Sequence, residues 1–238
     1  MRVLAVGCHP DDLEINAFGA LARCVQRGDE VIICGVANGS GGSMVLGPKE
    51  SAALRIREAT AAAKVIGAKD YINLGVDDLT IDSRDQTLID QMVDIIRMAK
   101  PDFIITQMPD DYQRDHSEVY NLVFDASFRA TIPNYKTQYP VHPIIAPIFS
   151  MEGSSGMRFQ PTDYVDITRT IDLKLEALAC HASQIEWLKA HVGKDLLSST
   201  KAAAIYYGKL SCCPFAEGFV RCNHVLRMDT YRYLPEGK

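Results

Sequence analysis

Two clusters of histidine and aspartate stand where buried strands are expected to end. The apolar run at residues 2–7 leads directly into His9-Pro10-Asp11-Asp12, and the run at residues 103–106 is followed after a short loop by Asp115-His116. Imidazole nitrogens and carboxylate oxygens bind zinc, and a catalytic zinc site has three protein ligands and an open position for water. The sequence therefore predicts a metal site formed by His9, Asp12 and His116.

The remaining carboxylate of the first cluster, Asp11, would lie beside this metal. Zinc lowers the pKa of a bound water to about 7, and a neighbouring carboxylate can accept its proton. A structural interpretation competes, because aspartate at the start of a helix accepts hydrogen bonds from backbone N–H groups. The motif alone leaves both interpretations open. The location of both clusters at strand ends favours the metal site, since ligands of open parallel sheets bind outside the carboxyl ends of the strands.

The elements that must position these side chains alternate along the chain. Continuous apolar runs, typical of buried parallel strands, occur at residues 2–7, 30–36, 71–74 and 103–106. Helical spacing of apolar residues is found at residues 13–27, 48–66, 87–99 and 116–130. Such alternation predicts βαβ units, and hence a Rossmann-like, doubly wound α/β fold with a mostly parallel sheet and helices on both faces.

The chain after about residue 131 has a different pattern. It is rich in proline, with short extended pieces at residues 144–149 and 164–167 and helices at 172–189 and 198–207. We expect this part to be a C-terminal elaboration that walls the site. Because there is no repeat, low-complexity tract or linker, we interpret residues 1–238 as a single domain.

Composition excludes several classes of function. The net charge of −5 disfavours a nucleic-acid partner, and no stretch reaches the roughly 20 apolar residues that span a bilayer. The seven cysteines form no CxxC motif, which favours reduced thiols in a cytoplasmic protein. The glycine-rich loop at residues 38–43 lacks the ending of a phosphate-binding loop and is expected to be a flexible border of the active site. Cys8 is expected to pack in the core, and Trp187 is expected to pack its helix down or to belong to a subunit interface.

Several segments together resemble a known family. Residues 5–14, Ala-Val-Gly-Cys-His-Pro-Asp-Asp-Leu-Glu, are similar to the opening signature of the PIG-L/LmbE-like family of zinc-dependent deacetylases. Similarity to later motifs of that family continues at residues 55–58, 74–78, 115–116, 164–168, 181–184 and 215–219. The resemblance covers nearly the whole chain.

The resemblance implies a function and a set of site residues. The reaction would be removal of an acetyl group from an N-acetylglucosamine-type sugar or a similar small N-acyl compound. It implies one Zn²⁺ per subunit on His9, Asp12 and His116, with Asp11 as the general base. Substrate contacts are expected from Arg55, Asp78, Ser40 and His181. The implied assembly is a homo-oligomer, a trimer or a hexamer.

One position departs from the family pattern. The family's His-x-Asp-His motif is Gln113-Arg114-Asp115-His116 here. Glutamine cannot carry a proton, although its amide can donate a hydrogen bond to an oxyanion. Asp115, without its usual imidazole partner, is then expected to orient His116. The proton for the leaving amine would come from Asp11, His181 or Tyr112.

Gln113 also motivates two other functions. The same metal site in a hydratase or lyase would act on an unsaturated carboxylic acid, with Arg55 anchoring the carboxylate. Alternatively, the chain is a sugar-binding relative that has lost catalysis. The presence of Asp11 in addition to the three ligands disfavours a purely binding role, because a structural zinc needs no further carboxylate beside an open position.

Overall fold

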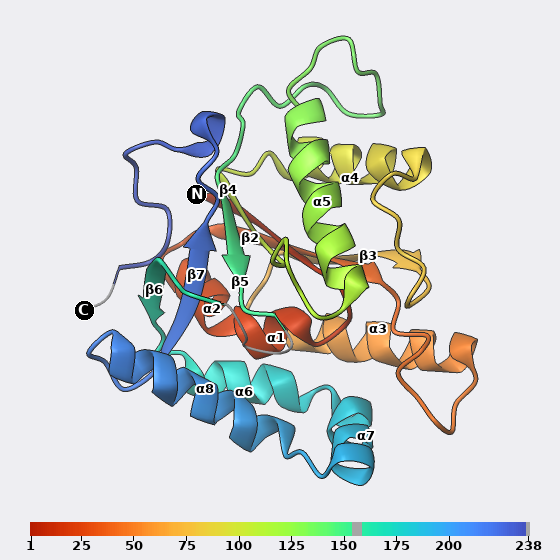
Figure 1. The fold of residues 1–238 in the computed structure, drawn as a ribbon, viewed down its shortest axis with the longest axis vertical. Helices are drawn as coiled ribbons and strands as arrows, with labels where there is room; N and C mark the ends of the chain where they lie inside the picture. Colours follow the sequence, from red (N-terminus) through yellow and green to blue (C-terminus); the bar gives the residue numbers. More distant parts are fainter. Residues whose placement is uncertain (154–158, 237–238) are drawn as a thin grey trace.

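A seven-stranded sheet forms the centre of the computed structural model, which describes residues 1–153 and 159–236 (Figure 1). Its strand order is β3-β2-β1-β4-β5-β7-β6. The strands are β1 (Arg2–Gly7), β2 (Glu30–Ala37), β3 (Asp70–Val76), β4 (Phe103–Thr106), β5 (Ile148–Met151), β6 (Asp163–Asp166) and β7 (Ala216–Arg221). Strands β1 to β5 pair in parallel, and β7 runs antiparallel to both β5 and β6. The predicted Rossmann-like α/β fold is confirmed.

Helices cover both faces of the sheet (Figure 1). They are α1 (Asp12–Asn16), α2 (Phe18–Gln26), α3 (Pro48–Val65), α4 (Gln86–Ala99), α5 (Arg114–Arg129), α6 (Ile171–Ala179), α7 (Ala182–Val192) and α8 (Leu196–Leu210). In β1, Val3 and Ala5 face a core shared with α2, α3 and α6, whereas Leu4 and Val6 face α4 and α5. Both faces of β1 are therefore buried, which explains its unbroken apolar sequence. Among the described residues, no helix is long and apolar enough to cross a membrane.

Several predicted boundaries were wrong. The single helix expected at residues 13–27 is α1 and α2, and the one expected at 172–189 is α6 and α7. The strand expected at residues 144–149 begins only at Ile148, and β7 was not predicted as a strand. Apolar periodicity runs through the first break because α1 and α2 pack on the same core, so the local pattern gives no sign of the interruption.

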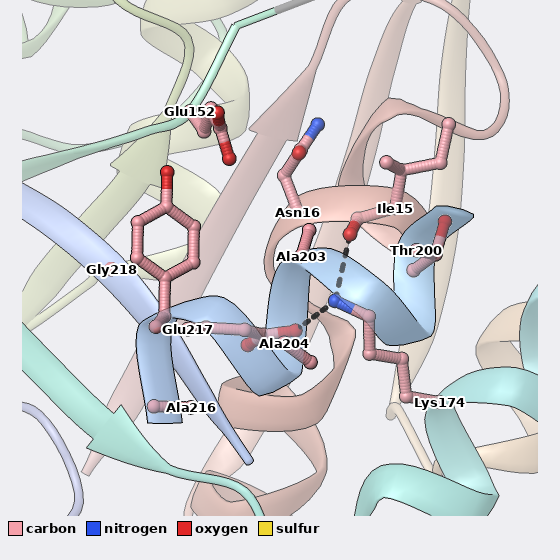
Figure 2. A pocket seen from close by; sticks show the side chains of 11 residues that line it. Ile15, Asn16, Glu152, Lys174, Thr200, Ala203, Ala204, Ala216, Glu217 and Gly218 are labelled. Atoms are coloured by element: carbon pink, nitrogen blue, oxygen red, sulfur yellow. Dashed lines mark hydrogen bonds and ion pairs between the residues drawn. The ribbon is translucent and has the colours of Figure 1, made fainter. Parts of the chain in front are cut away.

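A buried ion pair stabilises the break between α1 and α2. The Glu217 carboxylate accepts hydrogen bonds from the backbone N–H groups of Gly19 (2.9 Å) and Ala20 (2.7 Å), at the start of α2. The Lys174 ammonium contacts this carboxylate and donates to the Ile15 carbonyl (2.7 Å), at the end of α1 (Figure 2). Opposite charges thus meet the unpaired backbone groups of the two helix ends.

Replacing Lys174 by methionine is expected to lower the free energy of unfolding by about 3–5 kcal/mol, because it leaves a buried carboxylate without its cation. Urea unfolding followed by circular dichroism would measure this loss. Lys64→Met, at an exposed position of α3, is the matched control and should change little. Equal stability of the two variants would contradict the role assigned to Lys174.

Candidate metal centre and active site

The predicted site residues meet where the direction of chain winding reverses. β1 has β2 on one side and β4 on the other, so a crevice forms at their carboxyl ends. The turn after β1 supplies His9, Asp11 and Asp12, while His116 lies in the first turn of α5, after β4. Adjacent parallel strands therefore bring together side chains that are more than 100 residues apart in sequence.

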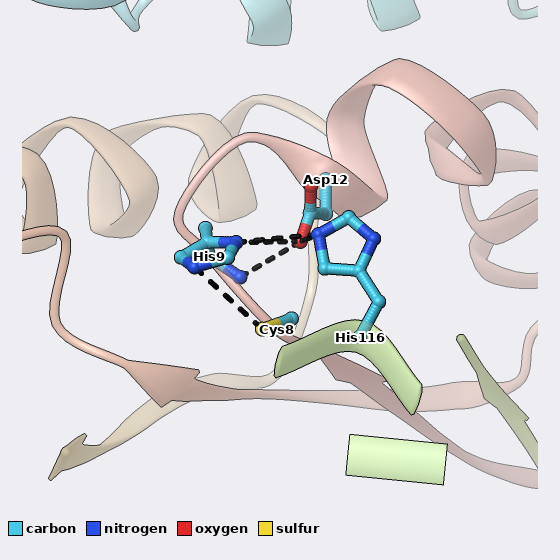
Figure 3. Close-up of side chains that lie close together, drawn as sticks. All are labelled: Cys8, His9, Asp12 and His116. Carbon is cyan, nitrogen blue, oxygen red and sulfur yellow. Dashed lines mark hydrogen bonds and ion pairs between the residues drawn. The ribbon is translucent and has the colours of Figure 1, made fainter. Parts of the chain in front are cut away.

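Three potential ligand atoms form a nearly equilateral triangle (Figure 3). His9 Nδ1 lies 3.3 Å from His116 Nε2 and 3.6 Å from Asp12 Oδ2, and the last two atoms are 3.3 Å apart. Four ligands at zinc distances of about 2.1 Å in a tetrahedron are separated by about 3.4 Å. The side chains fit a tetrahedral zinc site without rearrangement.

Each histidine turns its other nitrogen toward a second carboxylate. Asp115 Oδ2 is 3.4 Å from His9 Nε2, and Asp111 Oδ2 is 3.1 Å from His116 Nδ1. The expectation that Asp115 orients His116 was wrong: Asp115 and His116 are successive helical residues, whose side chains point about 100° apart. Asp111 takes that place and was not predicted, although it also follows the end of β4. Carboxylate–histidine pairs of this kind fix the ring orientation of metal ligands.

The electrostatics of the cluster favour a cation. Burial opposes charge on His9, but its hydrogen bonds to Asp115 and Asp12 outweigh that effect and hold the pKa well above its usual value. For His116, burial is likewise outweighed by Asp12 and Asp111, which raises its pKa. Burial acts against charge on Asp12 too, yet the neighbouring imidazoles keep its pKa well below its usual range. A field that stabilises two imidazolium ions also stabilises a metal ion between two neutral rings.

Cys8 lies next to this cluster, with its Sγ 3.8 Å from His9 Nε2. Its side chain is fully buried, which confirms the expected packing role. Burial raises the pKa of the thiol to about 12. Its Sγ lies beside His9 Nε2, the ring nitrogen that is not part of the triangle, which disfavours Cys8 as a ligand.

Asp11 is held beside the triangle in a strained conformation. Its φ of 114° is rare for a residue with a side chain, and such strain often persists at functional sites. The Arg55 guanidinium lies 3.2 Å from Asp11 Oδ2 and also donates to the Pro10 carbonyl. Burial raises the pKa of the Asp11 carboxyl to about 6, against the lowering effect of Arg55. A base of this pKa is suited to proton transfer near neutral pH.

The glycine-rich loop at residues 38–43 packs against the Arg55 side chain. A Cβ atom on Gly42 would overlap Arg55 Nη1, so glycine permits the close approach. Asp78 accepts hydrogen bonds from the backbone of Gly39 (2.8 Å) and Gly41 (2.9 Å), and its own N–H donates to Ser40 Oγ. Asp78 and Ser40 therefore shape the loop, and contact of either with a substrate remains a prediction.

An open cleft of about 630 Å³ lies above the triangle. Gln113, the residue that precedes α5, lines the cleft, and the hydrogen bond expected from its amide to an oxyanion remains a prediction. Trp187 was expected to pack α7 against the rest of the domain. It lines the cleft instead, together with Leu188 of the same helix. The predicted substrate residue His181 is fully buried between α6 and α7, where its Nε2 lies 2.9 Å from Glu14 Oε1.

Asp111→Asn should weaken metal binding about 10- to 100-fold, because outer partners of ligating histidines typically contribute that much. Titration with zinc under a competing chelator would measure the change. Asp125→Asn removes a half-exposed carboxylate from α5 and serves as the control. Unchanged zinc affinity in Asp111→Asn would show that the 3.1 Å contact does not support the ligand.

Comparison with known proteins places the chain among enzymes. A model of the PIG-L family, described as GlcNAc-PI de-N-acetylase, matches residues 4–127. The diacetylchitobiose deacetylase of Thermococcus kodakarensis is 26% identical, with 91% of this chain and 81% of that protein covered. The 4-oxalmesaconate hydratase of Pseudomonas putida is 27% identical, with 76% and 73% covered. The crystal structure of a conserved protein from Thermus thermophilus has the same fold, with a TM-score of 0.82, 24% identity and coverage of 98% and 100%.

Proposed function

Because the chain belongs to the PIG-L family of de-N-acetylases, we propose that it is a zinc-dependent hydrolase of N-acetylated amino sugars or similar small N-acyl compounds. The observation that carries the proposal is the triangle of His9 Nδ1, Asp12 Oδ2 and His116 Nε2, with the spare carboxylate of Asp11 beside it. One Zn²⁺ per subunit would occupy the triangle. A catalytic zinc site needs both features, three ligands and an adjacent base.

The residues of the cleft have distinct roles in this reaction. When bound, zinc would polarise the amide carbonyl and supply an activated water. Asp11 accepts the proton of the attacking water, and Arg55 holds its carboxylate in place from 3.2 Å. The Gln113 amide, at the rim of the cleft, donates a hydrogen bond to the developing oxyanion.

The cleft supports a substrate of sugar size. Its volume of about 630 Å³ lies within the range usual for small-molecule sites. Trp187 presents an aromatic surface of the kind that packs against the apolar face of a sugar ring, and Lys194 adds a charged group at the rim. The deacetylase activity of the Thermococcus relative points to the same substrate class.

Acetate release is the direct test. The zinc-loaded protein should free acetate from members of a panel of N-acetyl amino sugars, including N-acetylglucosamine and diacetylchitobiose. The same protein after removal of zinc is the control. Absence of acetate from the entire panel would reject the proposal.

Hydration of an unsaturated carboxylic acid is a second candidate. The hydratase relative and Gln113, in place of the histidine that the family pattern leads us to expect, both favour it. Arg55 would then bind the substrate carboxylate. A change in ultraviolet absorbance with conjugated dicarboxylic acids, without acetate release from N-acetyl sugars, would support this alternative.

We also propose a cytoplasmic homo-oligomer, a trimer or a hexamer. Exposed apolar side chains at Met44 (70% exposed), Val45 (93%) and Leu79 (84%) support burial against another subunit. Sedimentation equilibrium would measure the assembly, and a monomer at micromolar concentration would exclude it.

A further inference from the structure

The proposed deacetylation needs a proton for the leaving amine, and the structure narrows its source. Gln113 has no proton to give. Neither Tyr112 nor His181 is among the residues that line the cleft. Tyr112 is 85% exposed, and His181 is buried against Glu14. Asp11 would have to act as base and acid in succession.

Glu152 is a carboxyl that lines the same cleft as His9, Asp11 and Asp12. It follows the last residue of β5, and the pairing of Ser150 with Thr106 sets the end of β5 beside the end of β4. The next residue, Gly153, packs so closely on Asp111 that a Cβ there would overlap Asp111 Oδ2. Glu152 is therefore anchored next to the carboxylate that contacts His116, and its side chain lines the same cleft as the metal triangle.

The surroundings of Glu152 favour its protonated form. Burial raises the pKa of its carboxyl above the usual value, against the opposing effects of a hydrogen bond to Tyr207 and the charges of Lys174 and Lys194. Tyr207 comes from α8, Lys174 from α6 and Lys194 from the connection between α7 and α8.

The other carboxylates that line the cleft already have a partner or an assigned role. Asp11 and Asp78 both lie near the Arg55 guanidinium, at 3.2 and 3.9 Å, and Asp12 belongs to the metal triangle. Among the described residues that line the cleft, Glu152 is the carboxyl left for proton donation.

We propose that Glu152 is the general acid of the deacetylase, an inference that rests on the proposed function. As the oxygen of water bonds to the acyl carbon, Asp11 takes a proton from that water. As the C–N bond breaks, its electron pair goes to nitrogen, which takes the proton of the Glu152 carboxyl. The products are the free amine and acetate. Asp11 then loses its proton to solvent and Glu152 regains one, which restores the starting state of both groups.

The test compares two leaving groups in Glu152→Gln. On an N-acetyl amino sugar, kcat should fall about 10²- to 10⁴-fold with little change in KM, as for loss of a general acid. On p-nitrophenyl acetate, whose leaving group departs without a proton, the rate should stay within about threefold of wild type. Zinc content and thermal stability verify folding, and Glu186→Gln, exposed on α7, is the matched control.

The outcomes separate the two proposals. Equal losses on both substrates, a change in KM alone, or full activity of Glu152→Gln on the amide would overturn the role of Glu152 while deacetylation stands. A wild-type protein that releases no acetate from any N-acetyl sugar would overturn the proposed function and this inference with it.

Discussion

Removal of the metal is expected to abolish acetate release, and His116→Ala should do the same at ordinary zinc concentrations. His116 is almost fully buried and supplies one corner of the triangle, 3.3 Å from both His9 Nδ1 and Asp12 Oδ2. Loss of an outer partner alone weakens metal binding about 10- to 100-fold, so loss of a ligand should exceed that range. Added zinc should restore the wild-type protein after chelation but leave His116→Ala inactive.

A second readout makes this prediction independent of catalysis. Zinc binds the folded chain in preference to the unfolded one, so it should raise the melting temperature of wild type and not of His116→Ala. His224→Ala, which removes an exposed imidazole that contacts Cys222 and Phe124, is the control and should respond to zinc like wild type. If zinc leaves the melting temperature unchanged in the wild type as well as in both variants, the metal site is disproved.

Asp11→Asn is expected to lower kcat about 10²- to 10⁴-fold while zinc remains bound. The asparagine keeps the shape of the side chain but cannot accept a proton from water. Asparagine also tolerates positive φ better than most residues, so the φ of 114° should not prevent folding. The ion pair with Arg55 is lost as well, which leaves this buried guanidinium with only the more distant carboxylate of Asp78 (3.9 Å) and explains any accompanying loss of stability.

Steady-state kinetics together with zinc analysis would check this result. Arg55→Lys is the useful comparison, because it retains the positive charge near Asp11 but loses the planar guanidinium. It should impair catalysis less than Asp11→Asn does. If Asp11→Asn keeps wild-type kcat with full zinc content, another group must be the base.

The sequence alone predicted the fold class and grouped the three residues whose side-chain atoms form the triangle. Apolar runs of strand length alternate with helical periodicity, and that pattern has few parallel-sheet solutions because crossover connections are right-handed. Ligands in such sheets meet outside the carboxyl ends of the strands. His9, Asp12 and His116 could therefore be grouped before their distances were known.

Only the tertiary structure decided which groups support the triangle and shape the cleft. The rotation of α5 directs Asp115 to His9 and leaves His116 to Asp111. The break between α1 and α2 depends on Glu217, which lies 198 residues from Gly19 in sequence. Such pairings follow from the packing of distant elements, and local periodicity carries no information about them. For the same physical reason Trp187 and Glu152 became visible as cleft residues only once α7 and β5 were in place.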